Sequence, residues 1–505
     1  MASKSFLLLG LLVVAASVLL AQTEPVVASY EEVPKYFNRT NFGSGFLFGS
    51  SQSAYQYEGA ADKRGETIWD AFIRDFQSKI SDGSNATVAN GFYYLYKDDI
   101  KVMKAMGLDA FRFSISWARV LPHGKLSGGV NEIGVAFYNS LIDELLKHGI
   151  KPFVTLHHFD TPEALEKEYG SFLSDKIVND YGDYAEFCFK TFGDRVKYWI
   201  TFNEPNVFIP HGYDSGDMAP GRCSAWRNNS CPAGNSATEP YIVGHHLLLA
   251  HAEAVKRYKE KYQASQKGII GITIIVGGMY PLSDQDTLAA KRVQDFFSGW
   301  FLHPVVYGDY PRRMRALVRK RLPTFTAAET EILRGSYDFI GVNYYSSYYV
   351  ENVPFSNKPA HLSYSSDYYG TLATEKNGTT IGPLKGTLYS VPQGFRDVLN
   401  YIKTYYKSPT IYITENGTGQ TNNQTTEEGR KDPYRVDYYY SHLKALNQAI
   451  KEGVDVKGYL AWSQLDNFEW SSGYTIRYGI NYVDYATLKR YPKYSADFYK
   501  KFLLK

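Results

Sequence analysis

Two glutamates stand where buried strands are predicted to end. Residues 410–414 form a β-branched and aromatic run typical of a buried strand, and Glu415 follows directly before the turn signal Asn416-Gly417. A second run of this kind covers residues 198–203 and is followed by Glu204. The carboxyl ends of parallel strands form the ligand-binding edge of a barrel or an open α/β sheet. Glu204 and Glu415 are therefore the candidate catalytic residues.

Two carboxyl groups that flank one sugar ring can cleave a glycosidic bond. One protonates the leaving oxygen while the other acts at the anomeric carbon. A separation of about 5 Å retains the stereochemistry, whereas roughly 6.5–9.5 Å admits a water molecule and inverts it. The residues alone leave this choice open, and they also leave open a metal site or ordinary ion pairs. No Cys/His cluster has zinc spacing and no glycine-rich phosphate loop is found, so we expect no metal and no cofactor.

The elements that must position these glutamates alternate along the chain. Short β-like runs and longer amphipathic stretches follow one another with no break in composition, which predicts a single (β/α)₈ TIM barrel of the α/β class. Two Gly-, Ser-, Asn- and Pro-rich intervals, residues 206–236 and 351–387, are predicted to be long rim loops. The predicted strands are 46–53, 110–116, 151–158, 198–204, 269–276, 337–345, 410–414 and 456–463. Helices are predicted near 94–106, 136–147, 176–192, 241–262, 289–301, 392–406, 438–452 and 495–503.

The amino-terminal residues resemble a targeting segment rather than part of the fold. Lys4 precedes an apolar run at residues 6–20, so residues 1–28 are interpreted as a signal peptide cleaved between about 21 and 29. This run is shorter than the ~20 residues of a spanning helix, and we expect no membrane association of the mature domain, residues 29–505. The chain has 55 basic and 52 acidic residues, and we identify no basic tract, so no nucleic-acid partner is expected.

Further features fit the secretory route. Cys223 and Cys231 lie eight positions apart in a loop-like stretch and are predicted to form a disulfide, whereas Cys188 is predicted to be buried in a helix. The carboxyl terminus carries no retention tetrapeptide, so an extracellular (apoplastic) or vacuolar location is expected. A glycan on the sequon at Asn416 would block the predicted site, and we expect it unmodified. The other glycosylation acceptors by pattern are Asn38, Asn85, Asn228, Asn377 and Asn423.

Six ordered segments carry a resemblance that extends from about residue 42 to residue 499. They are Tyr55-Gln-Tyr-Glu-Gly, Phe111-Arg-Phe-Ser-Ile-Ser-Trp, Thr201-Phe-Asn-Glu-Pro, Asp338-Phe-Ile-Gly-Val-Asn-Tyr-Tyr, Ile413-Thr-Glu-Asn-Gly and Ala461-Trp-Ser-Gln-Leu-Asp-Asn-Phe-Glu-Trp. In this order they resemble the signature segments of family 1 glycoside hydrolases, and most closely those of plant β-glucosidases. The resemblance implies exo-acting, retaining hydrolysis of an O-linked β-glucoside, a small molecule, through a covalent glucosyl-enzyme.

The resemblance also implies roles for particular residues. Glu204 corresponds to the acid/base and Glu415 to the nucleophile, whose charge Arg112 would favour. Asn203 would hold the sugar 2-hydroxyl and Tyr345 would position Glu415. Asn343 is a supporting candidate, and the remaining sugar contacts would come from Gln56, His158, Trp462, Glu469 and Trp470. For His158 the alternative is a core histidine satisfied by backbone; His157, Trp117 and Trp199 are predicted to be structural.

Departures from the family pattern bear on the substrate. Phe159 stands where the family commonly has Trp, and Thr387 stands where many relatives carry a Trp that stacks on the aglycone, which puts flat aromatic stacking in doubt. Thioglucosidases of the family replace the acid/base with Gln, so the intact Glu204 disfavours that activity. A transglucosidase that passes the sugar to an alcohol uses the same two carboxylates and stays an alternative, as does a catalytically inactive sugar-binding barrel. The sequence leaves the aglycone and the oligomeric state open.

Overall fold

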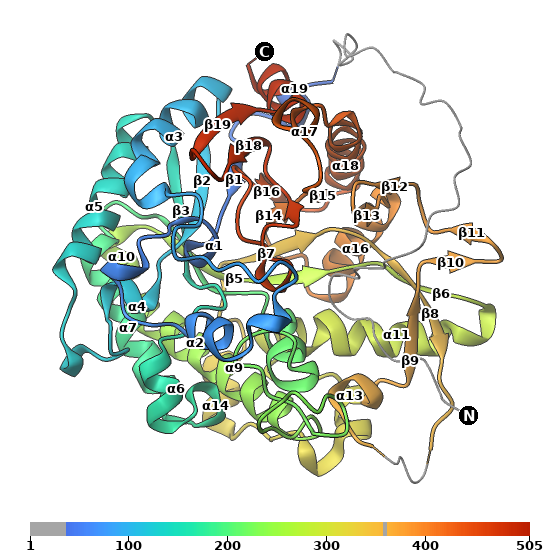
Figure 1. Ribbon diagram of the computed structural model, residues 1–505. Helices are drawn as coiled ribbons and strands as arrows, with labels where there is room; N and C mark the ends of the chain where they lie inside the picture. Colours follow the sequence, from blue (N-terminus) through green and yellow to red (C-terminus); the bar gives the residue numbers. More distant parts are fainter. Residues whose placement is uncertain (1–36, 357–360, 505) are drawn as a thin grey trace.

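A closed barrel of eight parallel strands forms the centre of the molecule (Figure 1). The computed structural model describes residues 37–356 and 361–504, so the predicted signal peptide lies outside the described residues. The strand order around the barrel is β1-β2-β3-β4-β5-β7-β14-β16, and β1 pairs with β16 to close it. The barrel strands are β1 (Leu47–Ser51), β2 (Ala110–Ser114), β3 (Lys151–His157), β4 (Tyr198–Asn203), β5 (Ile269–Val276), β7 (Phe339–Tyr344), β14 (Ile411–Asn416) and β16 (Val456–Trp462). The predicted TIM barrel is confirmed.

Helices surround the barrel as the alternation predicted (Figure 1). The long ones are α3 (Phe92–Met106), α5 (Glu132–Lys147), α7 (Lys176–Phe192), α9 (Glu239–Arg257), α16 (Pro392–Tyr405), α18 (Pro433–Lys451) and α19 (Tyr494–Leu503). Two predicted helices are interrupted by wider π turns. The first continues from α9 as Tyr258–Tyr262 and α10 (Gln263–Gln266), and the second is divided into α11 (Thr287–Gln294), the π segment Asp295–Gly299 and α12 (Trp300–Tyr307). Apolar spacing changes little between α and π turns, so the pattern gave no sign of either interruption.

The rim carries short elements that the sequence pattern did not predict. The short helices are α1 (Ala54–Tyr57), α2 (Ile68–Asp75), α4 (Trp117–Val120), α6 (Glu163–Tyr169), α8 (Pro205–Ile209), α13 (Arg312–Val318), α14 (Ala327–Leu333), α15 (Tyr364–Asp367) and α17 (Thr426–Arg430). A three-stranded sheet combines β6 (Met279–Pro281), β8 (Tyr348–Asn352) and β9 (Gly370–Ala373). Four small pairs are β10 (Glu375–Lys376) with β11 (Thr379–Thr380), β12 (Leu384–Lys385) with β13 (Leu388–Tyr389), β15 (Gln420–Thr421) with β17 (Ile476–Arg477), and β18 (Asn481–Asp484) with β19 (Lys489–Pro492). The predicted rim loop 351–387 therefore contains several of these small strands, with irregular backbone between them.

The amino-terminal end of the barrel interior is filled by a separate apolar cluster. Its centre is Phe153, whose ring stacks on Tyr198 at a centroid distance of 4.0 Å. The cluster takes one residue from each of seven strands: Leu47, Ala110, Phe153, Ile200, Phe339, Tyr412 and Leu460. Such a layer makes the barrel a packed core rather than a pore. The outer core lies between strands and helices and includes the buried Trp117, Trp199 and Cys188, as expected for structural residues.

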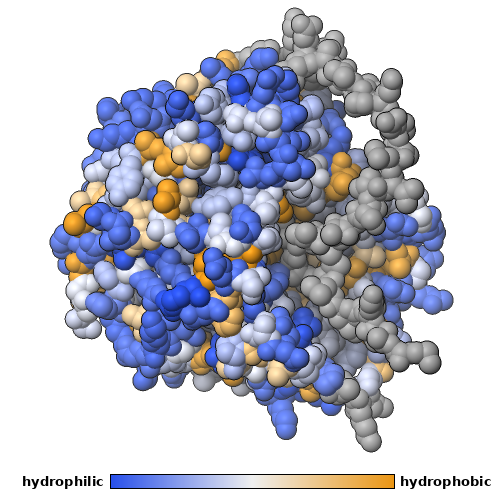
Figure 2. All heavy atoms as spheres, in the orientation of Figure 1, coloured by the Kyte–Doolittle hydropathy of each residue, from blue (hydrophilic) through white to orange (hydrophobic). Residues whose placement is uncertain are grey.

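The surface shown in Figure 2 is mostly hydrophilic, with apolar side chains in small separate groups. Isolated exposed apolar residues are normal for a folded chain, since polar atoms are too few to cover it. Among the described residues, no helix is both long and apolar enough to cross a membrane.

Candidate active site

The two candidate glutamates reach the carboxyl end of the barrel by different backbone routes. Glu204 follows the last residue of β4 and caps α8, with the left-handed angles φ 41° and ψ 56°. A non-glycine residue in this conformation costs roughly 1–3 kcal/mol, and such strain is concentrated at functional sites. Glu415 lies inside β14 opposite Asn343 of β7, where the strand register shifts. Both side chains are almost fully buried, at 7% and 3% exposed.

Asn343 links the two carboxyl groups. Its Nδ2 donates to Glu204 Oε1 at 2.7 Å and to Asn203 Oδ1 at 3.1 Å, while its Oδ1 accepts from Thr414 Oγ1 at 2.6 Å. Hydrogen bonding to the same amide also lowers the pKa of Glu415. The residues predicted from two remote segments of the sequence therefore lie in one mouth.

Glu415 is held by a cation and a phenol. Arg112 Nη1 donates to Oε1 at 2.5 Å, and Tyr345 Oη donates to Oε2 at 2.7 Å. The Arg112 guanidinium is itself fixed, because it donates to Asn203 Oδ1 at 2.6 Å and to Thr155 Oγ1 at 3.2 Å. Charge-assisted hydrogen bonds of this kind are among the strongest in proteins. Both oxygens of Glu415 thus have partners that favour the carboxylate.

The two carboxyl groups differ in their tendency to hold a proton. Burial raises the pKa of Glu204 well above its usual range, and the negative charge of Glu415 raises it further. Burial also raises the pKa of Glu415, but Arg112 and Tyr345 oppose this effect. Because the strongest opposing partners lie on Glu415, the shared proton of the pair is favoured on Glu204.

His158 offers an unused hydrogen-bond donor to the mouth. The Oδ1 of Asn203 faces Arg112, so its Nδ2 faces His158 and donates to Nε2 at 3.1 Å. Burial and the Arg112 charge hold the pKa of His158 well below its usual range, and the ring is neutral. With Nε2 accepting, the ring proton is on Nδ1, which has no partner among the described residues. The alternative of a histidine satisfied by backbone does not match this geometry.

The remaining predicted sugar contacts gather around His158 and Gln56. Trp462 and Trp470 lie nearly parallel to the His158 ring, with centroid distances of 5.9 and 6.0 Å. Gln56, on α1, donates from Nε2 to Glu469 Oε2 at 3.4 Å and to the Phe468 carbonyl at 2.9 Å. Burial raises the pKa of Glu469 to about 8. All the predicted site residues therefore line one region of the barrel end.

A family model for glycosyl hydrolase family 1 matches residues 38–505. The chain belongs to glycosyl hydrolase family 1. It is 54% identical over 477 residues to β-glucosidase 12 of Oryza sativa subsp. indica, with 93% of each chain covered. It is 53% identical to furcatin hydrolase of Viburnum furcatum, covering 94% of this chain and 90% of that protein. A rice β-glucosidase mutant, solved in a covalent complex with Glc, matches with a TM-score of 0.90 and 48% identity, covering 93% of this chain and all of that one.

Membership of family 1 fixes the class of reaction. The protein is a glycoside hydrolase of the retaining β-glucosidase type. Among the described residues no cluster of His, Cys, Asp or Glu side chains is suited to hold a metal ion. The candidate site of this family 1 enzyme is lined by carboxyl, amide, imidazole and aromatic groups.

Two supporting features of this family 1 site have no direct signal in the sequence. Thr414 and Thr155 fall within predicted strands, and their hydroxyls fix Asn343 and Arg112. A buried ion cluster also supports the segment that carries Glu469: Asp466 accepts from Arg477 and from Lys493, both at 2.7 Å. Alternation places Thr414 and Thr155 in strands, but only the three-dimensional register shows which partner each one meets.

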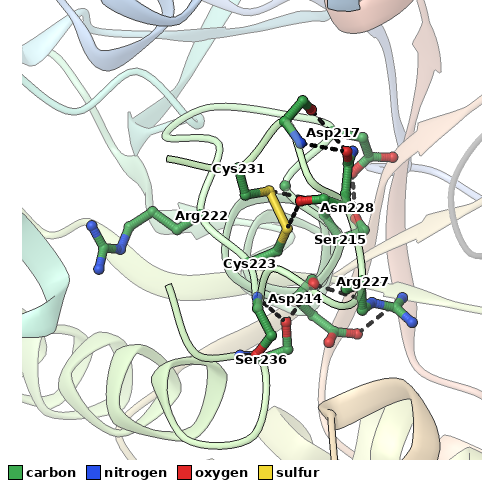
Figure 3. The surroundings of a disulfide bond; sticks show 12 residues. Asp214, Ser215, Asp217, Arg222, Cys223, Arg227, Asn228, Cys231 and Ser236 are labelled. Atoms are coloured by element: carbon green, nitrogen blue, oxygen red, sulfur yellow. Dashed lines mark hydrogen bonds and ion pairs between the residues drawn. A yellow bond between two sulfur atoms is a disulfide. The ribbon is translucent and has the colours of Figure 1, made fainter. Parts of the chain in front are cut away.

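The predicted disulfide of this family 1 enzyme lies on the rim loop between β4 and α9 (Figure 3). Cys223 and Cys231 are joined, with their Cα atoms 5.6 Å apart. Arg227 and Ser236 both donate to the Asp214 carbonyl, next to the bridge (Figure 3). The disulfide and these bonds together fix the loop.

The sequons of this family 1 enzyme differ in access. Asn85, Asn377 and Asn423 are exposed, and Asn38 and Asn228 are partly exposed. Asn416 is fully buried, and its Nδ2 donates to the Tyr344 carbonyl at 2.7 Å and to Tyr438 Oη at 3.1 Å. A glycan replaces a hydrogen of this nitrogen, so the folded protein has no room for one at Asn416.

Proposed function

We propose that this enzyme is an exo-acting β-glucosidase in which Glu415 is the nucleophile and Glu204 the acid/base. The observation that carries the assignment is the asymmetry of the pair. Glu415 has Arg112 and Tyr345 on its two oxygens, which favours the carboxylate needed for attack. Among the described residues, Glu204 accepts a side-chain hydrogen bond from the neutral amide of Asn343 alone, and its pKa is raised by burial and by Glu415, which favours the acid needed for protonation.

The proposed reaction has two steps at the anomeric carbon. Glu415 forms a bond to this carbon while the bond to the leaving oxygen breaks, and Glu204 gives its proton to that oxygen. Glu204, now a carboxylate, takes a proton from water as the water oxygen attacks and releases Glu415. Asn203 is proposed to bind the sugar 2-hydroxyl, because its amide is oriented by Arg112 and His158.

The other sugar contacts follow from the free polar groups around the mouth. The Nδ1–H of His158 and the carboxyl of Glu469 are proposed to bind sugar hydroxyls, with Gln56 alongside. Trp462 and Trp470 supply aromatic faces for the sugar ring. We propose that these contacts surround one glucose unit, which would favour exo action.

The aglycone is proposed to meet an aliphatic wall rather than a flat aromatic one. Thr387 lies in the turn between β12 and β13, and the neighbouring Leu388 packs against Trp462, Ile476 and Tyr478. We therefore propose O-linked glucosides of small molecules without a large planar aglycone as the preferred substrates. Initial rates on a panel of natural glucosides with matched planar and non-planar aglycones test this preference.

We also propose that the chain passes through the secretory route to an extracellular or vacuolar compartment. The disulfide and the exposed sequons at Asn85, Asn377 and Asn423 support this proposal. Mass spectrometry of the protein isolated from a eukaryotic host tests it, with glycan masses expected at the exposed sequons and none at Asn416.

Covalent trapping tests the catalytic assignment. A 2-deoxy-2-fluoro-β-glucoside with a good leaving group slows hydrolysis of the intermediate and should add one fluoroglucosyl mass to the enzyme. Peptide mapping should place this mass on Glu415. The Glu204→Gln variant serves as the matched control, since it keeps the nucleophile and should still be labelled by an activated reagent. A label on any other residue contradicts the proposal.

A further inference from the structure

A short basic run interrupts the balanced charge of the chain. Residues 312–321 contain six Arg or Lys side chains and no acidic residue. The run forms α13 and the following 3-10 turn, Arg319–Arg321. The whole chain has 55 basic and 52 acidic residues, and this near balance does not reveal a local run. The expectation that the chain has no basic tract was therefore wrong for residues 312–321.

Only half of the basic run is neutralised by ion pairs. The pairs are Arg313 with Asp295, Arg315 with Asp309, and Arg321 with Asp367. Arg312, Arg319 and Lys320 are exposed and make no ion pair or side-chain hydrogen bond with a described residue. Three positive charges are thus left without a partner on one short segment.

Two of the unpaired side chains, Arg319 and Lys320, line a surface groove. A groove of about 520 Å³ is lined by Arg315, Arg319, Lys320, Leu322, Pro323 and Thr324. This volume lies within the ordinary range of ligand-binding sites. Arg319 adopts φ 57° and ψ −130°, a backbone conformation that only glycine adopts readily. The backbone therefore holds Arg319 at the groove in spite of a conformational cost, as is common where a side chain must be presented to a ligand.

The groove lies on the outer edge of the same barrel end as the catalytic mouth. Arg321, which directly precedes the groove residue Leu322, donates to the carbonyl of Ala237 at 2.9 Å and to Asp367. Ala237 belongs to the rim loop that enters α9, and Asp367 belongs to α15 in the rim loop after β8. The groove therefore borders rim loops at the end of the barrel that carries the glucose site.

We propose that this groove binds a carboxylated polysaccharide, a chain of uronate units, and holds the enzyme on it. Arg guanidinium groups match the planar geometry of a carboxylate, and the exposed Thr324 and partly exposed Pro323 suit the hydroxyls and faces of sugar rings. A lipid surface fits less well, because the large hydrophobic side chain in this groove, Leu322, is only 4% exposed and has nothing to insert. The proposal does not depend on the roles assigned to Glu204 and Glu415.

The test compares binding of the intact enzyme to polygalacturonate oligomers and to the same oligomers after methyl esterification. Isothermal titration at low salt should show binding to the acid form and none to the ester, and the affinity should fall as salt is added. The double variant Arg319→Gln/Lys320→Gln should bind the acid form about 10-fold more weakly or worse. Its hydrolysis of a soluble aryl glucoside should be unchanged, which shows that the fold is intact.

A matched control removes the same charge elsewhere. The double variant Lys444→Gln/Lys451→Gln, on α18, should bind polygalacturonate within about twofold of the wild-type enzyme, since these exposed lysines lie outside the groove. Equal losses in both double variants would overturn the proposal in favour of general charge attraction. Equal binding of the ester would also overturn it, as would Arg319-dependent binding to phosphatidylserine vesicles without binding to the uronate chain.

Discussion

The two ends of the barrel interior are built from the same strands and serve opposite purposes. β2 supplies Ala110 to the amino-terminal apolar layer and Arg112 to the mouth, two positions later. β14 likewise supplies Tyr412 to the layer and Glu415 to the mouth. In β2 alternation sends both residues to the interior, whereas in β14 the register shift between Ile413 and Glu415 offsets the odd spacing of Tyr412 and Glu415. One strand thus carries packing at its start and chemistry at its end.

The difference in chemistry predicts a difference in energetics. The apolar layer stabilises the fold through burial and packing. The mouth instead buries charges whose desolvation is costly and a left-handed glutamate, and its side chains are ordered for reaction rather than for stability. Substitutions in the mouth should therefore change activity much more than folding, and substitutions in the layer should do the reverse.

The largest expected effect is the loss of activity in Glu415→Gln. The neutral amide has no nucleophilic oxygen for the anomeric carbon, so kcat for an aryl glucoside should fall by roughly 10⁴-fold or more. Circular dichroism should show an unchanged fold. If the kcat of Glu415→Gln stayed within tenfold of wild type, the proposed difference between a catalytic mouth and a structural apolar layer would be wrong.

The second largest effect is expected in Glu204→Gln, whose kcat/KM should depend strongly on the acidity of the leaving group. Loss of the proton donor should lower kcat/KM by about 10²–10⁴-fold for glucosides of poorly acidic alcohols. A dinitrophenyl glucoside needs no protonation of its leaving oxygen, so its first step should be largely spared. Rates across a series of aryl glucosides measure this, and a uniform loss across the series would contradict the acid role.

In the amino-terminal apolar layer, Phe153→Ala should lower stability and leave activity nearly unchanged. Removing this ring from its stack with Tyr198 should lower the free energy of unfolding by about 3–5 kcal/mol. Below the melting temperature, kcat and KM should stay within about twofold, because Phe153 lies in the layer and not among the mouth residues. Urea unfolding and steady-state kinetics on the same preparation provide both values. A large change in kcat without destabilisation would show that the two ends are coupled.

The smallest expected effect is a pH-dependent gain of stability in Glu469→Gln. The pKa of this carboxyl is about 8 when folded and about 4.3 when unfolded, so the native state is penalised increasingly as pH rises from 4.3 towards 8. The variant carries no such penalty. Its advantage should reach the order of 1 kcal/mol or more at pH 7–8 and vanish near pH 4. If the melting temperatures of Glu469→Gln and wild type differed by the same amount at pH 4.5 and pH 8, the raised pKa of Glu469 in the folded protein would be contradicted.

The sequence predicted the parts of this structure that repeat. The barrel strands and the long helices follow from periodicity, and residues 176–192 match α7 at both ends. The two glutamates were found because each follows a strong strand pattern. The π segments at residues 258–262 and 295–299 and the small rim strands were not predicted, because they depend on tertiary packing and leave no periodic signal.

Within the candidate site, residue types were predicted better than partnerships. Arg112 and Asn343 were named as supporting residues, but the sequence could not show that Asn343 donates to Glu204 or that Asn203 is oriented from both sides. Those contacts depend on how neighbouring strands are placed in three dimensions, which a sequence pattern does not give. The basic run at residues 312–321 was overlooked because charge was averaged over the chain.

Closure of the barrel between its first and last strands has a consequence for biosynthesis. If the chain enters a glycosylating compartment, as proposed above, the amide of Asn416 would be an acceptor for the oligosaccharide-transferring enzyme until β16 has been made and has paired with β1. In a chain glycosylated there, Asn416 could not form its hydrogen bonds with Tyr344 and Tyr438. Such a chain should fail to fold and be degraded. The yield of folded enzyme in a glycosylating cell should then depend on whether β14 packs into the barrel before the oligosaccharide is transferred. The Asn416→Gln variant has no acceptor at this position, so transfer there could not occur.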